Sequence, residues 1–250
     1  MRLPSPFSVW GEHLAIDFPG ARAVFTTRRG GVSRGPYASL NLGRLTPDDP
    51  EAVQRNRDLV QSRIGVRLAM VRQVHGTRVF VHDDPDEVSG PAPQRELEEA
   101  DGHATALPGI APIVLTADCL SIALAGRGGV AMLHAGWRGL ADGVIAEGVR
   151  TLRELTGDET FSAAIGPGAG GCCYEVGEEI HERFAAYGDG VHRGRNLDLK
   201  AIAREQLQRE GAVVVHNAEL CTICSPPSLF FSHRRDRGVT GRQAGIAWLT

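Results

Sequence analysis

One stretch of the sequence, Thr116 to Gly139, constrains the fold more than any other. It reads TADCLSIALAGRGGVAMLHAGWRG, in which two apolar runs of strand length flank a Gly-rich connection at residues 126–129. Glycine supplies the positive φ angles that tight hairpin turns require, so the pattern predicts a β-hairpin. Folding the chain back at this turn brings position 119 close to position 134, at the end opposite the turn. We therefore expect Cys119 and His134 to be neighbours in space.

A thiol beside an imidazole has two chemical interpretations. The imidazole can activate the thiol as a nucleophile, or both groups can be ligands of a metal ion. A third side chain bears on the choice, because His75 ends another apolar run, in RQVHG, and is followed by glycine. Two histidines and one cysteine form a three-ligand set that suits Zn²⁺ and leaves a fourth position for water or substrate. Sequence spacing alone does not bring His75 to the hairpin, so both interpretations stay open at this point.

Composition narrows the class of protein. The chain has 250 residues, of which 42% are hydrophobic and 23% charged, as in ordinary globular proteins. A net charge of −3 gives no electrostatic case for binding nucleic acid or an anionic membrane. We find no signal-peptide pattern and no apolar run of the roughly 18 residues that a membrane span needs. The five cysteines are an odd number, which favours reduced thiols over a disulfide framework. We expect a cytoplasmic protein that binds neither nucleic acid nor a membrane.

Helical and extended segments are mixed along the chain without a regular βαβ alternation. Helices are predicted over residues 50–64, 137–156 and 177–187, and another is predicted to begin after Asp198 and to end at Gly211. Strands are predicted at 21–27, 68–74, 78–82, 212–216, 229–235 and 244–249. Residues 83–100 are acidic and Pro-rich, which predicts a surface loop. We find no repeat or linker and expect one domain over residues 1–250, with the hairpin at its centre and the helix over 137–156 covering it.

Seven motifs of this chain, in order, resemble those of a known family. They are FTTRRGGVSRGPYASLNLG, RQVHG, ADGHAT, TADCLSIALA, HAGWRGL, AIGPGAGGCCYEVG and SHRRDRGVTGRQAGIAWL. From about residue 20 to the C-terminus the chain resembles the YfiH-type laccase-domain family, whose members are also called multicopper polyphenol oxidases, purine nucleoside phosphorylases and peptidoglycan editing factors. The resemblance implies an α+β fold of mixed β-sheets packed as a sandwich with helices on the outside, similar to that of cysteine-dependent toxin deamidases. It also implies that His75, Cys119 and His134 bind one metal ion.

The chemistry behind the family's names can be weighed against the histidines of this chain. A laccase needs a blue copper and a three-copper cluster, and therefore many histidines, typically in His-X-His pairs. This chain has nine histidines, and no two are separated by a single residue. One His₂Cys site suits instead a Lewis acid that activates water, which purine deamination requires.

We therefore predict a zinc-dependent purine nucleoside enzyme, with His75, Cys119 and His134 as both metal ligands and catalytic residues. It is expected to phosphorolyse adenosine, inosine or methylthioadenosine and to deaminate adenosine, with purine nucleosides and phosphate as its partners. The alternatives are a copper-dependent polyphenol oxidase, a hydrolase that edits peptidoglycan precursors, and a protein whose metal is purely structural.

Phosphorolysis also requires an anion site for phosphate beside the ribose. Arg28 and Arg29 precede Gly30 and Gly31, where guanidinium groups and backbone N–H groups can bind phosphate. Arg138, four residues after His134, is a further phosphate-binding residue predicted here. Tyr174 and Glu175 follow a Gly-rich loop and are predicted to contact base or ribose, with capping of the next helix as an equally supported alternative.

Four further features have weaker functional signals. Asp118 precedes Cys119 and is predicted either to orient the site or to take part in catalysis. His103, in ADGHAT, lines the pocket or makes a hydrogen bond in a turn, and the second interpretation is preferred. Cys221 and Cys224 form a single C-x-x-C without a second pair nearby in the sequence, which favours core packing over a zinc site. The adjacent Cys172 and Cys173 have no predicted role.

Overall fold

The predicted hairpin is the centre of the molecule. In the computed structural model, which describes residues 3–84 and 97–250, strand β8 (Leu120–Gly126) pairs antiparallel with β9 (Gly129–Ala135). Arg127 and Gly128 form the turn, and Gly128 has a φ of 75°. Every residue of both strands is buried, which explains why the strands read as continuous apolar runs rather than as alternating ones.

The hairpin belongs to a six-stranded mixed sheet with the strand order β13-β10-β8-β9-β6-β5. The four added strands are β13 (Val215–Asn217), β10 (Phe161–Ile165), β6 (Gly102–Thr105) and β5 (Val79–His82). The two outer pairs, β10 with β13 and β5 with β6, are parallel, and the inner pairs are antiparallel.

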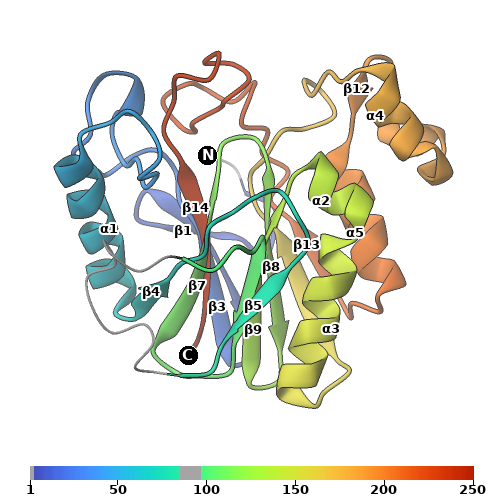
Figure 1. The fold of residues 1–250 in the computed structure, drawn as a ribbon, viewed down its shortest axis with the longest axis horizontal. Helices are drawn as coiled ribbons and strands as arrows, with labels where there is room; N and C mark the ends of the chain where they lie inside the picture. The colour runs from blue at the N-terminus through green and yellow to red at the C-terminus, as the bar shows by residue number, and fades with distance from the viewer. Residues whose placement is uncertain (1–2, 85–96) are drawn as a thin grey trace.

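A second six-stranded sheet, ordered β1-β2-β3-β14-β7-β4, packs face to face on the first (Figure 1). Its strands are β1 (Ser8–Trp10), β2 (His13–Phe18), β3 (Ala21–Phe25), β14 (Gln243–Leu249), β7 (Ile110–Thr116) and β4 (Arg67–Ala69). Between the sheets, Phe25 and Val114 of the second sheet share one buried cluster with Ala123 and Met132 of the first. This packing is a β-sandwich.

Helices cover both outer faces of the sandwich (Figure 1). On the second sheet lies α1 (Pro50–Ile64), and on the hairpin sheet lie α2 (Trp137–Asp142), α3 (Val144–Thr156) and α5 (Leu199–Arg209). Helix α4 (Glu178–Arg183), the two-stranded ribbon β11 (His192–Arg193) with β12 (Asn196–Leu197), and three short 3₁₀ turns lie in the connections. The 3₁₀ turns are Gly35–Tyr37, Ala185–Tyr187 and Asp189–Val191. The expected α+β sandwich with helices on the outside is thus confirmed.

Two helices have the ends that the sequence predicts. Helix α1 follows Asp49, whose side chain accepts a hydrogen bond from the N–H of Glu51 at 3.0 Å, and it ends at Gly65, with φ 76°. The carboxylate of Asp198 likewise accepts a hydrogen bond from the N–H of Ala201, which caps α5. No helix among the described residues is long and apolar enough to cross a membrane.

Other predicted elements are shorter or divided. The helix expected over 137–156 is two helices, because Gly143 adopts a φ of 98° between α2 and α3. The helix expected over 177–187 ends at residue 183 and continues only as a 3₁₀ turn. The strands expected at 21–27, 68–74 and 212–216 cover residues 21–25, 67–69 and 215–217.

The strand predicted at residues 229–235 is absent, and the segment is an irregular loop. Its backbone is held by side chains instead of a strand partner: the Arg235 guanidinium donates to the carbonyls of Phe230 and Thr222, each at 2.8 Å. Asp236 pairs with the same guanidinium at 2.8 Å. Most of the loop predicted at residues 83–100 lies outside the described residues.

Candidate functional site

The structure brings Cys119 and His134 together at the open end of the hairpin, as predicted, and adds His75. Cys119 immediately precedes β8, and His134 lies in β9 opposite Ser121. The ligand atoms of His75, Cys119 and His134 all lie within 4.8 Å of one another. The two imidazole rings meet edge to face, with their centroids 4.8 Å apart. We call these three residues the triad.

A buried carboxylate that the sequence analysis missed holds the triad in place. Asp101 is fully buried, and its carboxylate accepts hydrogen bonds from three consecutive backbone N–H groups, those of residues 74–76, at 3.1, 2.9 and 2.6 Å. The same carboxylate accepts a hydrogen bond from Nδ1–H of His134 at 2.7 Å. This bond fixes the His134 tautomer and leaves Nε2 available as a ligand atom. One side chain therefore orients both histidines.

A signal for Asp101 is present in the sequence, in the motif ADGHAT. This residue directly precedes β6, which pairs with β9 in the register that places Gly102 opposite Leu133. The backbone continues that pairing, because the N–H of His134 donates to the carbonyl of Asp101 at 2.7 Å. Only the pairing of β6 with β9 shows that positions 101 and 134 are neighbours.

The triad favours a thiolate next to an imidazolium when no metal is bound. Burial raises the pKa of Cys119, but the charge of His134 and hydrogen bonds from both histidines outweigh it and lower the pKa to about 6. Burial lowers the pKa of His134, but the Cys119 thiolate and Asp101 outweigh it and raise the pKa to about 9. The thiolate is the form that binds metals and attacks electrophiles, so the geometry suits both chemical interpretations of the pair.

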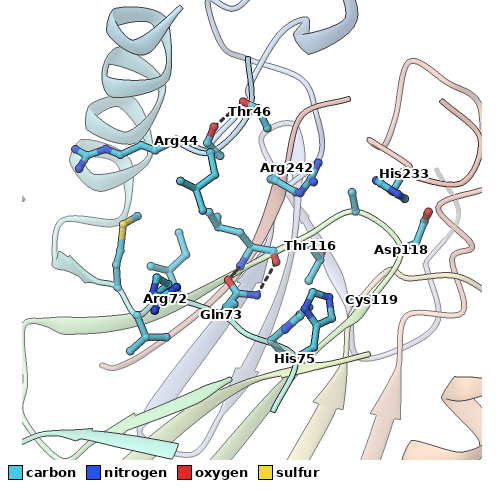
Figure 2. Close-up of a pocket in the computed structure, with 18 of the residues that line it drawn as sticks. Arg44, Thr46, Arg72, Gln73, His75, Thr116, Asp118, Cys119, His233 and Arg242 are labelled. Atoms are coloured by element: carbon cyan, nitrogen blue, oxygen red, sulfur yellow. Dashed lines mark hydrogen bonds between the residues drawn. The ribbon is translucent and has the colours of Figure 1, made fainter. Parts of the chain in front are cut away.

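Two polar side chains fix the segments that lead into the triad. The amide of Gln73 donates to the carbonyl of Leu115 at 2.9 Å and accepts from its N–H at 2.8 Å, so that it stands in for a strand partner (Figure 2). Asp118, with φ 93°, accepts hydrogen bonds from the Thr222 hydroxyl and the Arg234 N–H, each at 2.7 Å. Of the two predicted roles of Asp118, this geometry supports the orienting one.

The triad opens into a pocket of about 690 Å³, a volume suited to a ligand of nucleoside size (Figure 2). One part of its lining is apolar: Met70, Val71, Leu97, Ile113 and Leu115. Another part is polar and largely cationic: Arg44, Arg57, Arg72, Asp118, Tyr174, His233, Arg234 and Arg242. His233, Arg234 and Arg242 come from the last of the seven motifs, yet the sequence analysis assigned none of them to the site.

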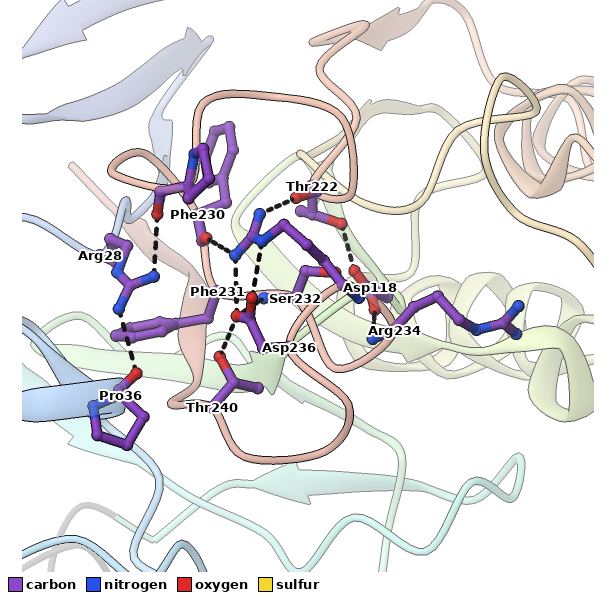
Figure 3. Close-up of polar contacts among 12 residues, drawn as sticks. Arg28, Pro36, Asp118, Thr222, Phe230, Phe231, Ser232, Arg234, Asp236 and Thr240 are labelled. Atoms are coloured by element: carbon purple, nitrogen blue, oxygen red, sulfur yellow. Dashed lines mark hydrogen bonds and ion pairs between the residues drawn. The ribbon is translucent and has the colours of Figure 1, made fainter.

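Arg28, predicted to bind phosphate, lies elsewhere. Its guanidinium donates to the carbonyls of Pro36, Ala38 and Pro227, at 3.1, 2.5 and 2.9 Å. The group also lies over the ring of Phe231, at 4.3 Å from its centroid (Figure 3). Arg28 does not line the pocket, and its donors are already bound to backbone carbonyls. The geometry therefore gives Arg28 a structural role in place of the predicted one.

Of the other predicted substrate contacts, only Tyr174 lines the pocket. Arg29 donates to the carbonyl of Ser228 at 3.0 Å, Arg138 lies 4.5 Å from the ring of Trp137, and Glu175 pairs with Arg195. The guanidinium of Arg234 lies over the ring of Tyr174, with its Cζ 5.2 Å from the ring centroid.

Both predictions for His103 are wrong, because this residue lies neither in the pocket nor in a turn. It lies in β6, fully buried, and its Nε2–H donates to the carbonyl of Ile113 at 2.9 Å. Its Nδ1 then accepts a hydrogen bond from Nε2–H of His82, also at 2.9 Å. These two histidines form a neutral buried pair inside the hairpin sheet.

Comparisons with known proteins agree with the fold and give similar chains over nearly the whole length. A purine nucleoside phosphorylase of Pseudomonas aeruginosa is 39% identical, over 94% of this chain and 98% of the relative. One of Streptomyces coelicolor is 40% identical, over 92% of this chain and 96% of the relative. The crystal structure of a hypothetical protein YfiH from Bacillus licheniformis superposes with a TM-score of 0.91 at 31% identity, covering 99% of this chain and 100% of the other.

A family model also matches most of the chain. The model described as multi-copper polyphenol oxidoreductase laccase matches residues 22–250, which include the triad, Asp101 and every residue that lines the pocket. The chain therefore belongs to this laccase-domain family, which includes the YfiH proteins.

Proposed function

We propose that this chain is a metal-dependent purine nucleoside phosphorylase that also deaminates adenosine. The observation that carries the proposal is that the triad and a cationic surface face the same pocket of about 690 Å³. A metal-ligand set and an anion-binding surface are the two features that deamination and phosphorolysis respectively need. The names of relatives at 39% and 40% identity support phosphorolysis.

We propose His75, Cys119 and His134 as the ligands of one zinc ion. Two imidazoles and one thiolate are a donor set that zinc favours, and their ligand atoms lie close enough to converge on one ion. Asp101 acts as the outer carboxylate that orients His134, an arrangement common at zinc sites. Zinc bound there would supply a Lewis acid that polarises a substrate group and activates water.

The proposed phosphate contact is Arg242 rather than Arg28. Arg242 lines the pocket, and its Nη1 donates to the carbonyls of Thr240 and Gly241 at 3.1 and 3.0 Å. These bonds hold the guanidinium in place, so that little side-chain freedom is lost when it binds an anion. In phosphorolysis a phosphate oxygen bonds to the ribose C1′ while the C1′–N9 bond breaks, and the departing purine gains a proton. Phosphate must therefore be held in line with that bond.

The apolar part of the lining is the proposed seat of the purine ring. Val71, Ile113 and Leu115 line the pocket together with the triad, and Gln73 fixes Leu115 through its backbone. A purine there is removed from water, while its sugar reaches Tyr174 and Asp118 on the polar part. The polar groups then set the orientation of the nucleoside, and the apolar groups supply its affinity.

The test of the proposal is a pair of assays on one variant. Zinc-loaded wild-type protein is expected to convert inosine and phosphate to hypoxanthine and ribose 1-phosphate, and adenosine to inosine. Arg242→Gln is expected to raise the KM for phosphate about tenfold or more, with zinc content and deamination retained. Arg29→Gln, which changes an arginine outside the pocket, is the matched control and keeps the wild-type KM. Zinc-loaded protein that phosphorolyses no purine nucleoside would refute the proposal.

Copper-dependent phenol oxidation is the second candidate, because the matching family model carries that description. His₂Cys is also the core of a blue-copper ligand set. Elemental analysis and oxygen uptake with a phenol separate the two functions. Copper in the purified protein together with phenol-dependent oxygen uptake favours oxidation, whereas zinc without uptake favours the purine reactions.

A further inference from the structure

Four of the five cysteines gather at a second place in the molecule, apart from the triad. The Sγ atoms of Cys172, Cys173, Cys221 and Cys224 all lie within 4.8 Å of one another. Cys172 Sγ is 3.5 Å from both Cys173 Sγ and Cys224 Sγ. The sequence predicts core packing for Cys221 and Cys224, because it shows no second pair nearby. Cys221 is buried but Cys224 is exposed, and the fold supplies a second pair from the adjacent cysteines. We call the four residues the thiol cluster.

The spacing of the sulfurs matches a tetrahedral metal centre. Zinc–sulfur bonds of about 2.3 Å imply sulfur–sulfur edges of about 3.8 Å in a tetrahedron. The distances of 3.5 Å between thiols in contact and the limit of 4.8 Å for the whole group lie on both sides of this value. Small side-chain rotations are therefore enough to place all four sulfurs around one ion.

Backbone N–H groups point at the buried sulfur of the cluster. Cys221 Sγ accepts a hydrogen bond from the N–H of Gly170 at 3.3 Å, and the N–H groups of Ile223 and Cys224 also donate to it. The turn is closed by the N–H of Ser225, which donates to the carbonyl of Cys221 at 3.1 Å. Such N–H donors stabilise the thiolate form that ligates metals and orient the sulfur.

A buried cation lies beside the cluster. Lys200, on α5, is 6% exposed, and its Nζ donates to the carbonyl of Leu220 at 2.6 Å. Its ammonium interacts favourably with Cys221 and Cys172 when these cysteines are ionised. Four thiolates around one divalent ion carry a net charge of about −2, so a neighbouring cation offsets part of the cost of burying that charge.

We propose that Cys172, Cys173, Cys221 and Cys224 bind a second, structural zinc ion. All four coordination positions are filled by the protein, which leaves none for a substrate and is typical of structural rather than catalytic zinc. The ion would join two loops that are distant in sequence, 166–177 and 218–225. These loops already touch through the parallel bridge of Gly168 with Cys221.

The joined loops carry residues of the polar side of the pocket. Tyr174 follows Cys173 directly and lines the pocket. Thr222 follows Cys221, and its hydroxyl donates to Asp118 at 2.7 Å, beside the ligand Cys119 (Figure 3). The proposed ion thus fixes the two segments that position Tyr174 and Asp118. The proposal does not depend on the reaction catalysed in the pocket, and its test reads metal content rather than activity.

The first experiment counts metal in protein purified under reducing, oxygen-free conditions. Wild-type protein is expected to hold about two zinc ions per chain, one for each donor set. The Cys119→Ala/His134→Ala variant, which lacks two ligands of the triad, is expected to keep about one. Cys221→Ser/Cys224→Ser is also expected to keep about one, held by the triad. A Cys119→Ala/His134→Ala variant that binds no zinc would overturn the proposal.

The second experiment uses cobalt(II) as a spectroscopic probe of the cluster. Metal-free wild-type and Cys119→Ala/His134→Ala proteins are titrated with cobalt, whose thiolate charge-transfer absorption in the near ultraviolet grows with the number of sulfur ligands. Intense absorption that persists in the Cys119→Ala/His134→Ala variant, and falls when Cys224→Ser is added to that variant, supports four-thiolate ligation. A titration that finds three free thiols in the metal-free protein despite reductant, and therefore a stable disulfide in the cluster, would overturn it.

Discussion

The triad and the thiol cluster are two groups of candidate metal ligands built in opposite ways. In the triad, Cys119 and His134 stand at the open end of the hairpin, and His75 lies in the connection between β4 and β5. The buried carboxylate of Asp101 orients the triad, which faces the pocket. The thiol cluster stands entirely on loops and supplies four sulfurs of its own. Three ligands on a rigid frame leave room for a substrate, whereas four ligands on loops close the site and join the loops. In our proposal, the number of protein ligands and the elements that support them distinguish the reactive site from the structural one.

The largest expected effect comes from removing a ligand of the triad. His134→Ala is expected to lower the rates of phosphorolysis and deamination on the order of 1000-fold or more, because the metal and its activating effect are lost. Steady-state assays of both reactions, with metal analysis, check this. Cys224→Ser is the matched change in the thiol cluster and is expected to keep at least about a tenth of the activity. Equal losses of activity in the two variants would contradict the assignment of the triad as the reactive site and the thiol cluster as the structural one.

Replacing the supporting carboxylate is expected to have the next largest effect. Asp101→Asn removes the charge that orients His134, and it is expected to weaken zinc binding at the triad about 10- to 100-fold. Competition with a coloured chelator measures the affinity, and the affinity of the thiol cluster is expected not to change. Asp236→Asn alters a carboxylate with a comparable set of hydrogen bonds outside both sites and is the control. Unchanged affinity in Asp101→Asn would mean that the triad needs no such support.

The link between the two regions is expected to give a smaller effect. Thr222→Val removes the hydroxyl that donates to Asp118, leaving one buried carboxylate oxygen without that bond. A cost of about 1–3 kcal/mol to the free energy of unfolding is expected, with a several-fold fall in kcat/KM and unchanged metal content at both sites. Thr240→Val removes a similar bond, to Asp236, and is expected to lower stability alone. If Thr222→Val keeps the wild-type kcat/KM, this hydrogen bond does not connect the thiol cluster to the activity of the pocket.

Buried histidines outside both metal sites are expected to make the stability of the protein depend on pH. Burial lowers the pKa values of His13 and His82 to about 4 and that of His103 to about 3. Because these folded-state values lie below the ordinary value, the unfolded chain binds more protons between about pH 6.5 and 4. Their stabilising contribution is complete above about pH 6.5 and declines as the pH falls.

Denaturant unfolding at pH 7, 6 and 5 measures this decline. Each buried histidine contributes at most about 1.4 kcal/mol per pH unit to the slope. His13→Asn keeps an acceptor for the N–H of Thr27 and is expected to make the slope shallower. His233→Asn changes an exposed histidine and is expected to keep the wild-type slope. A slope that does not respond to His13→Asn would mean that this histidine is protonated in the folded protein.

Features that depend on a few neighbouring residues were determined by the sequence alone. The Gly-rich turn at 126–129 sets the pairing of β8 with β9, and this pairing places Cys119 near His134. Asp49, Pro50 and Gly65 likewise set the ends of α1, because capping and positive φ are local properties. The motif order was also sufficient to indicate the family.

Only the tertiary structure decided the contacts between distant segments. Asp101 reaches the triad through the register of β6 on β9, and Arg28 binds carbonyls of two loops instead of lining the pocket. The thiol cluster forms because the bridge of Gly168 with Cys221 joins two loops far apart in sequence. Such contacts depend on how whole sheets pack, where burial and hydrogen bonding summed over many residues outweigh any local preference.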